Sequence, residues 1–141
     1  MSLNKVMSIK CETMDFAKHT DPVVIKVPEG TVLTSEHVRQ CLKDNPGVTD
    51  IKIPAGVTKI GYTTFNGCSS LRSIDIPDSV TKIGNEAFRG CSSLESIEIP
   101  AGVTKIGNSA FSGCSSLRSI DIPDSVTKIG NEAFHGCSSL E

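Results

Sequence analysis

The sequence has few aromatic residues and no long apolar run. It contains no tryptophan and only one tyrosine, so five phenylalanines carry nearly all of the aromatic volume. No apolar stretch approaches the roughly 20 residues that a membrane-spanning helix requires, and the opening residues, MSLNKVMSIK, lack the apolar segment of a secretory signal. These absences predict a soluble chain with no membrane insertion, whose core consists mainly of aliphatic side chains.

An excess of one charge is also missing. The 141 residues include 14 lysines and arginines against 16 aspartates and glutamates, for a formal net charge of -2. Proteins that bind nucleic acid through its phosphates normally carry a basic excess. The composition therefore gives no indication of a nucleic-acid partner.

What the sequence has in abundance is one motif of 23 residues. The segment 71–93, LRSIDIPDSVTKIGNEAFRGCSS, recurs over 48–70, 94–116 and 117–139. A fixed period in the twenties is typical of a solenoid, in which each unit buries its apolar side against its neighbours. The chain stops two residues into a fifth unit, which predicts a fragment of a longer array or an idealised repeat protein.

We divide the chain accordingly into two parts. Residues 1–47 form an N-terminal cap that includes a degenerate repeat, and residues 48–141 hold the four units and the start of the fifth. The second and fourth units differ only at Arg89 and His135. This near-identity indicates recent duplication or deliberate design.

Each unit contains two extended pieces and a turn. In LRSIDIP, Ile74 and Ile76 alternate with Ser73 and Asp75, which is the pattern of a half-buried strand. SVTKIG predicts a second short extended piece, and NEAFRGC a single helical or 3-10 turn that ends at Gly90 with a positive φ. The predicted fold is an α/β repeat, a right-handed solenoid with a parallel sheet of short strands and short helical or 3-10 turns.

The sequence of the N-terminal cap predicts a short strand, a degenerate repeat and one helix. Residues 6–11 have strand character, residues 12–22 read as a polar connection, and VVIKVPEG over 23–30 resembles IKIPAG of the first unit. Thr34 or Ser35 can cap a helix that ends at residues 45–47. Its predicted apolar face consists of Val38, Cys41 and Leu42. We expect the cap to cover the edge of the first repeat strand.

Stacking the units turns each repeated position into a column with a spacing of ~4.8 Å. The predicted columns are phenylalanine (Phe65, Phe88, Phe111, Phe134), lysine (Lys59, Lys82, Lys105, Lys128), threonine (Thr58, Thr81, Thr104, Thr127) and cysteine (Cys68, Cys91, Cys114, Cys137). Because the Cβ vectors within a column are parallel, a disulfide between neighbouring units would distort the coil. We therefore expect four buried free thiols, whereas a bridge between Cys11 and Cys41 in the cap remains open.

Two kinds of chemistry are considered, metal binding in the cap and catalysis by the repeated serines. His37 and Cys41 lie four apart on the predicted helix and could form a zinc site with Cys11 and His19, but the spacing matches no compact zinc motif. The repeated serines, such as Ser69 and Ser70, recur at every turn and lack a partner histidine, as expected for structural turns. We predict no catalytic residue, no cofactor and no metal.

The repeated string LxSIxIPxxVTKIGxxAFxGCSS resembles the BspA-like class of leucine-rich repeats over residues 48–141. Val48 and Thr64 in the first unit depart slightly from it. The resemblance implies a curved leucine-rich-repeat solenoid without catalytic activity. It also implies protein binding, most often adhesion to host or matrix proteins, and a cell-surface or secreted location, although this chain shows no signal peptide.

Two surfaces are candidate sites. The first is the strand face, expected to bind a basic protein partner. Its residues are Lys52, Arg72, Ser73, Asp75, Glu95, Ser96, Glu98, Arg118, Ser119 and Asp121. The alternative is a self-association module that forms a homo-oligomer through its C-terminal edge. This edge consists of Ile122, Val126, Ile129 and Phe134.

Overall fold

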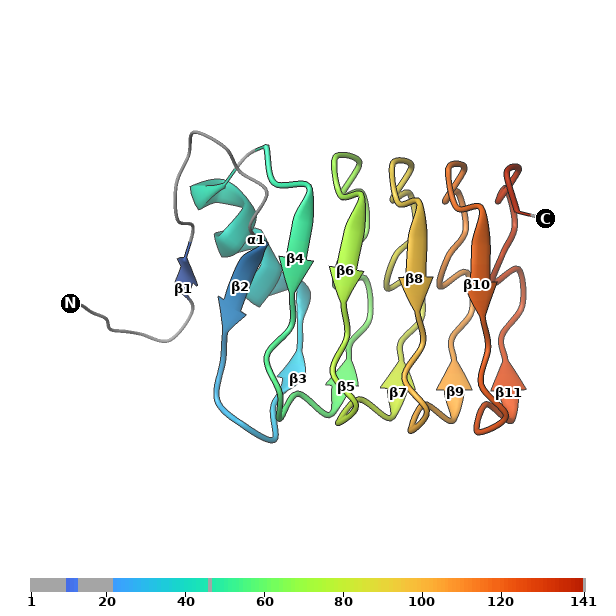
Figure 1. Ribbon diagram of the computed structural model, residues 1–141, viewed down its shortest axis with the longest axis horizontal. Helices are drawn as coiled ribbons and strands as arrows, with labels where there is room; N and C mark the ends of the chain where they lie inside the picture. Colours follow the sequence, from blue (N-terminus) through green and yellow to red (C-terminus); the bar gives the residue numbers. More distant parts are fainter. Residues whose placement is uncertain (1–9, 13–21, 46, 141) are drawn as a thin grey trace.

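The computed structural model describes residues 10–12, 22–45 and 47–140. The repeats form coils that stack side by side along one axis, with the N-terminal cap at one end and the last coil at the other (Figure 1). Each coil of the repeat region contributes one strand of three residues and one strand of two. The predicted solenoid is therefore confirmed.

The longer strands build the strand face. Residues 23 positions apart pair in parallel, as in Ile51 with Ile74 and Ile97 with Ile120. The hydrogen-bonded ladder is interrupted between β6 and β8, which separates the sheet β1-β2-β4-β6 from the sheet β10-β8, whereas a strict period predicts one continuous ladder. The strands are β4 (Asp50–Lys52), β6 (Ser73–Asp75), β8 (Ser96–Glu98) and β10 (Ser119–Asp121).

The shorter strands form a second, continuous parallel sheet in the order β11-β9-β7-β5-β3. Each contributes one outward lysine and one inward isoleucine, except β3, where valine and leucine stand in these positions. The second extended piece predicted in each unit is thus a strand. These strands are β3 (Val32–Leu33), β5 (Lys59–Ile60), β7 (Lys82–Ile83), β9 (Lys105–Ile106) and β11 (Lys128–Ile129).

The turn that closes each coil is hydrogen-bonded in two directions. The amide of Ala87 donates to Gly84 O within the coil, an i→i−3 bond, whereas the amide of Phe88 donates to Ala110 O of the next coil. Gly90 has the predicted positive φ, 79°. A second left-handed residue in each turn was not predicted, because it is not a glycine. These residues are Thr63, Glu86, Ser109 and Glu132, with φ of 55–59°.

The phenylalanine column is the centre of the core. Neighbouring rings are stacked with centroids 5.1, 5.2 and 5.5 Å apart, and the interplanar angles are at most 5°. Phe65, Phe88 and Phe111 are fully buried, which is worth about 1.5–3 kcal/mol each from transfer out of water. The predicted column is confirmed.

The cap contains the predicted helix, α1 (Ser35–Asp44). Thr34 is its N-cap, and the Thr34 amide donates to His37 Nδ1 at 3.1 Å. Val38 and Cys41 are buried. At the end of the helix, Cys41 O accepts both the backbone amide and the side-chain amide of Asn45, each at 3.0 Å.

Two strands of the cap extend the strand-face sheet beyond the first repeat. β2 (Val23–Lys26) pairs in parallel with β4, and β1 (Lys10–Glu12) pairs antiparallel with β2. The edge of β4 is therefore covered, as predicted. β1 coincides with the end of the strand expected over 6–11, whereas residues 6–9 and most of the expected connection, residues 13–21, lie outside the described residues.

Candidate functional site

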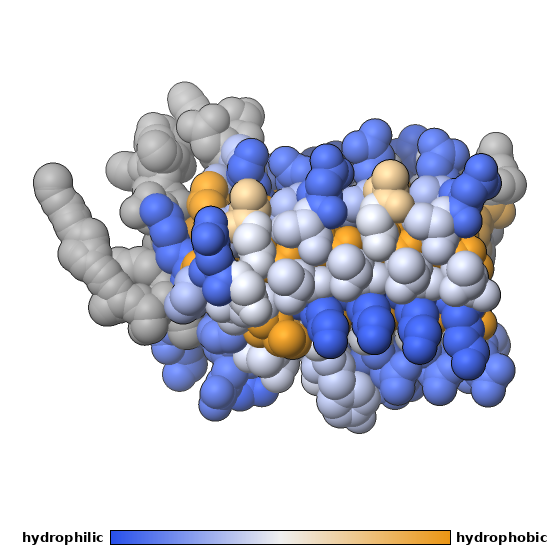
Figure 2. All heavy atoms as spheres, turned by 90° about the horizontal axis from the view of Figure 1, so that it is seen from below, coloured by the Kyte–Doolittle hydropathy of each residue, from blue (hydrophilic) through white to orange (hydrophobic). Residues whose placement is uncertain are grey.

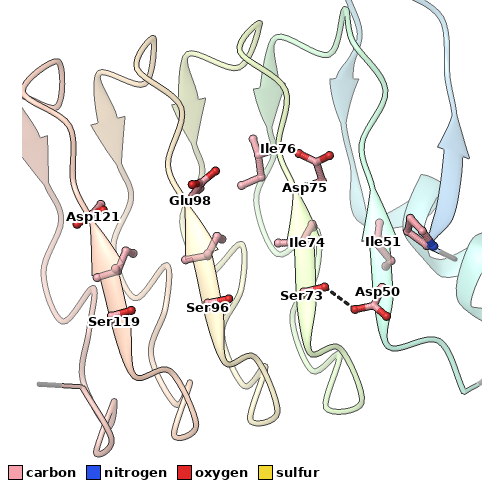
Figure 3. Close-up of a pocket in the computed structure, with 13 residues that line it drawn as sticks. Asp50, Ile51, Ser73, Ile74, Asp75, Ile76, Ser96, Glu98, Ser119 and Asp121 are labelled. Carbon is pink, nitrogen blue, oxygen red and sulfur yellow. Dashed lines mark hydrogen bonds between the residues drawn. The ribbon is translucent and has the colours of Figure 1, made fainter. Parts of the chain in front are cut away.

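The strand face carries a groove of about 700 Å³ that crosses β4, β6, β8 and β10 (Figure 3). Within each strand, the middle isoleucine turns toward the core and its two neighbours turn outward, because successive side chains alternate across a sheet. The polar residues that line the groove are Asp50, Ser73, Asp75, Ser96, Glu98, Ser119 and Asp121.

Stacking arranges these polar side chains in two parallel rows (Figure 3). Ser73, Ser96 and Ser119 form one row, and the acidic row consists of Asp75, Glu98 and Asp121. All three acidic residues are exposed. Register places them on successive strands, with Asp121 opposite Glu98, so their carboxylates lie along one line across the sheet.

The acidic row is only partly neutralised. Lys52 Nζ lies 3.6 Å from Asp75 Oδ2, and this pair occupies one end of the row. Among the described residues, Glu98 and Asp121 have no ion-pair partner. Two like charges about 5 Å apart, the spacing of neighbouring strands, repel by about 0.8 kcal/mol in water. A cation bound in the groove would remove this repulsion.

Four residues predicted for the site lie beside the groove instead of lining it, namely Lys52, Arg72, Glu95 and Arg118. Arg72 and Arg118 both contact Glu95, with nitrogen–oxygen distances of 3.2 and 3.6 Å. The ion pair between Arg72 and Glu95 forms as predicted. Exposed ion pairs of this kind contribute about 0–1 kcal/mol. Two arginines against one glutamate leave one positive charge beside the groove, whereas every charged residue that lines the groove is acidic.

Asp50 was not predicted as a site residue. It lies in the serine row, one coil before Ser73, and the Ser73 hydroxyl donates a hydrogen bond to its carboxylate (Figure 3). Pro22 lines the same end of the groove. Subtracting one period from Ser73 would have found Asp50, whereas nothing in the sequence indicated Pro22.

The four repeat cysteines are free thiols, as predicted, and all but Cys137 are buried. The Cys91 thiol donates to Phe65 O of the preceding coil at 3.2 Å, and the Cys114 thiol repeats this contact with Phe88 O. Burial raises the pKa of Cys68 to about 11 and, with a smaller contribution from Cys137, that of Cys114 to about 12. These neutral thiols fill space in the core and are not nucleophiles.

The cap does not provide the zinc site considered above. Cys41 is disulfide-bonded and His37 Nδ1 accepts the helix-capping bond, so neither is available as a ligand. Cys11 and His19, the other two residues of that set, have side chains outside the described ones. In the described ranges, no group of three or more histidine, cysteine, aspartate or glutamate residues could hold a metal ion.

The C-terminal edge is partly exposed. Ile122 and Ile129 are 37% and 45% exposed, whereas Ile83 and Ile106, the equivalents of Ile129 in the preceding coils, are at most 2% exposed. Val126 and Phe134 are half-buried. Within the described part of the chain, no helix is long and apolar enough to cross a membrane.

Parallel coils of about 23 residues, a ladder of short strands and a buried aliphatic and phenylalanine core define a leucine-rich-repeat protein. The model of the BspA type leucine-rich repeat region matches residues 38–141 in six copies. The chain therefore belongs to the BspA-type leucine-rich repeat family. No curated protein sequence matches it.

Solved structures support the same assignment. The chain is 42% identical to a leucine-rich repeat protein from Bacteroides ovatus, with a TM-score of 0.64, over 70% of this chain and 24% of the other. It is 28% identical to a leucine-rich repeat protein of T. pallidum, with a TM-score of 0.68, over 85% and 62% of the two chains. The chain thus spans less than two thirds of the length of either.

Proposed function

We propose that the chain is a non-enzymatic protein-binding module whose strand-face groove binds a basic segment of a protein partner. The observation that carries the proposal is the acidic row, in which Glu98 and Asp121 lie exposed without a countercharge among the described residues. Complementary charge accelerates encounter and selects among partners. The family assignment supports a role in protein interaction.

The groove offers two kinds of contact to such a segment. The carboxylates can accept charge-assisted hydrogen bonds from lysine or arginine, which are about twice as strong as bonds between neutral groups. The serine row beside them can donate to and accept from the backbone of the bound chain. Because the rows cross several strands, affinity is expected to grow with the number of coils engaged.

The family resemblance supports a more specific role, adhesion to host or matrix proteins at the cell surface. We expect no catalysis and no cofactor in this role. A recognition surface built from repeated coils needs neither, because its specificity comes from the residues that vary between units.

The test uses a labelled peptide of alternating lysine and serine as the probe. The double variant Asp75→Lys/Asp121→Lys should abolish binding, because it reverses the acidic row. The matched control is Asp78→Lys/Asp124→Lys, which makes the same change of charge at exposed positions in the same two coils but outside the groove. Equal binding by the two variants would show that the strand face is not the binding site.

A second candidate function is self-association through the C-terminal edge. The exposure of Ile122 and Ile129, whose counterparts are buried in preceding coils, favours it. An unpaired strand edge with apolar flanks is a ready partner for another copy. Light scattering over a concentration series should show a mass increase that Ile122→Lys/Ile129→Lys suppresses. A monomer at all concentrations would disprove this function.

A further inference from the structure

The second sheet carries a groove that the protein-binding proposal does not use. It has a volume of about 260 Å³ and runs along β7, β9 and β11. The lysines of these strands line it, together with the Ile-Gly-Asn segments that follow Lys82 and Lys105 and with Gly130. No acidic residue is among the lining residues. A row of hydrophilic side chains runs along this side of the molecule (Figure 2).

The lysines form one unbroken row. Strand pairing places Lys59, Lys82, Lys105 and Lys128 next to one another in register, ~4.8 Å apart. All four are exposed, and none has an ion-pair partner among the described residues. Four cations that repel one another and lack countercharges make a local positive surface on a chain of net charge -2.

An asparagine row lies beside the lysines. The side-chain oxygen of Asn85 accepts the amide of Asn108 at 2.8 Å, and Asn108 repeats this bond with Asn131. These bonds fix the orientation of the Asn85 and Asn108 carboxamides, because each side-chain oxygen already accepts a hydrogen bond. The Nδ2 groups of Asn85 and Asn108 have no acceptor among the described residues, so they remain available as donors. The groove therefore presents donors from both lysine and asparagine.

An aromatic side chain stands at one end of the asparagine row. Tyr62 occupies the asparagine position of the first repeat, and its backbone lies against Gly84 in the floor of the groove. It is 67% exposed, and it is the only tyrosine of the chain. The nearby Val32, which pairs with Lys59, is 41% exposed. Tyr62 and Val32 do not line the groove themselves, and they extend its first end with an apolar surface on which a ring with an apolar face can stack.

We propose that this groove binds a linear acidic polysaccharide. Carboxylate and sulfate oxygens accept hydrogen bonds without donating them, which suits a groove of ammonium and amide donors. A row with one cation per coil suits a polymer with an anionic group on successive sugars, and Tyr62 can stack on a pyranose ring. Duplex DNA fits less well, because its phosphates advance by about 3.4 Å along each strand.

The experiment measures binding of two labelled octasaccharides by fluorescence anisotropy, a heparin fragment for sulfate and an oligogalacturonate for carboxylate. The variant is Lys82→Gln/Lys105→Gln. The matched control is Arg39→Gln/Lys43→Gln, which removes the same charge from exposed sites of α1 outside the groove. Thermal melts establish that both variants fold. The glycan that binds identifies the preferred anion.

We expect Lys82→Gln/Lys105→Gln to weaken binding by about tenfold or more. The variant should also lower the salt slope, d log K/d log [salt], by about 2, because each ammonium group that pairs with an anion of the ligand contributes about one unit. The control variant should change neither quantity. Tyr62→Ala should weaken glycan binding and leave the salt slope unchanged, because it removes a stacking surface and no charge.

Three results would overturn the proposal. The first is that neither octasaccharide binds the unmodified chain. The second is that both double variants weaken binding equally, which would indicate a general charge effect. The third is that a single-stranded oligonucleotide of equal charge binds as tightly as the better glycan and Tyr62→Ala has no effect, which would remove the saccharide assignment.

Discussion

The rings of Phe88 and Phe111 lie parallel, 5.2 Å apart with an interplanar angle of 3°. The residues are separated by one period, and both rings are fully buried at equivalent positions of successive coils. Because every coil contacts only its neighbours, the stability of such an array is approximately a sum of coil and interface contributions. Removing one ring therefore weakens two interfaces.

Phe111→Ala should lower the free energy of unfolding by about 3–5 kcal/mol, because the flanking coils cannot collapse into the cavity. Phe134→Ala is the control. Phe134 is half-buried and stacks on Phe111 alone, so its loss should cost less. Urea denaturation measures both. A cost below about 1 kcal/mol for Phe111→Ala would contradict its placement in the core.

Gly107→Ala should be destabilising by about 1–3 kcal/mol, the usual cost of overpacking. A Cβ at this position would lie 2.5 Å from both the amide nitrogen and Oδ1 of Asn85 in the preceding coil, and the backbone there cannot yield. Gly47→Ala is the matched control, since no atom lies within 4 Å of its added Cβ. An equal change in melting temperature for the two variants would contradict this close approach.

Ser109→Asn should stabilise the protein by about 0.5–1 kcal/mol. Ser109 has a φ of 55°, a conformation that costs most residues about 1–2 kcal/mol but that asparagine adopts more readily. Ser112→Asn in the same turn serves as the control, because the φ of Ser112 is not positive. Chemical denaturation measures the change in the free energy of unfolding for each variant. Equal changes would show that the left-handed backbone is not the cause of the stabilisation.

Stability should fall as the pH rises above about 9. Burial raises the pKa of Cys68 to about 11 and that of Cys114 to about 12, from 9.0 in the unfolded chain. Between these values the unfolded state ionises first, so the native state holds more protons. Its stability is complete below pH 9 and is lost progressively toward pH 12.

Denaturation at pH 7, 9, 10 and 11 measures this loss. Burial raises the pKa of Cys91 as well. Cys68→Ala/Cys91→Ala/Cys114→Ala therefore removes all three buried thiols while keeping small apolar side chains, and it should flatten the alkaline part of the profile. An unchanged slope in that variant would assign the loss to other groups, such as lysine.

Thiol titration should count four reactive groups in the denatured, non-reduced protein and six after reduction. The four repeat cysteines are free, and Cys41 is disulfide-bonded. In the native state at pH 8 all but Cys137 should react slowly, because Cys68, Cys91 and Cys114 are buried and stay protonated. Six groups without reduction would contradict the disulfide, and rapid native reaction would contradict the burial.

The 23-residue period alone was enough to place Phe88 beside Phe111, to line up the lysines and cysteines, and to define the repeated strand. A strict repeat converts sequence distance into spatial contact, since identical units must bury identical surfaces against one another. The cap helix was also predictable, because Thr34 and the apolar spacing of Val38 and Cys41 are local signals. The acidic row follows from the same register.

Other features were decided by the way the coils pack. Ser109 has no local preference for a left-handed backbone, and adopts one because the turn must send alternate amides to the next coil. The carboxamide of Asn85 is fixed by an amide 23 residues away, and the close approach at Gly107 exists only between coils. Local propensity cannot register such contacts, because their energy comes from atoms of the neighbouring coil.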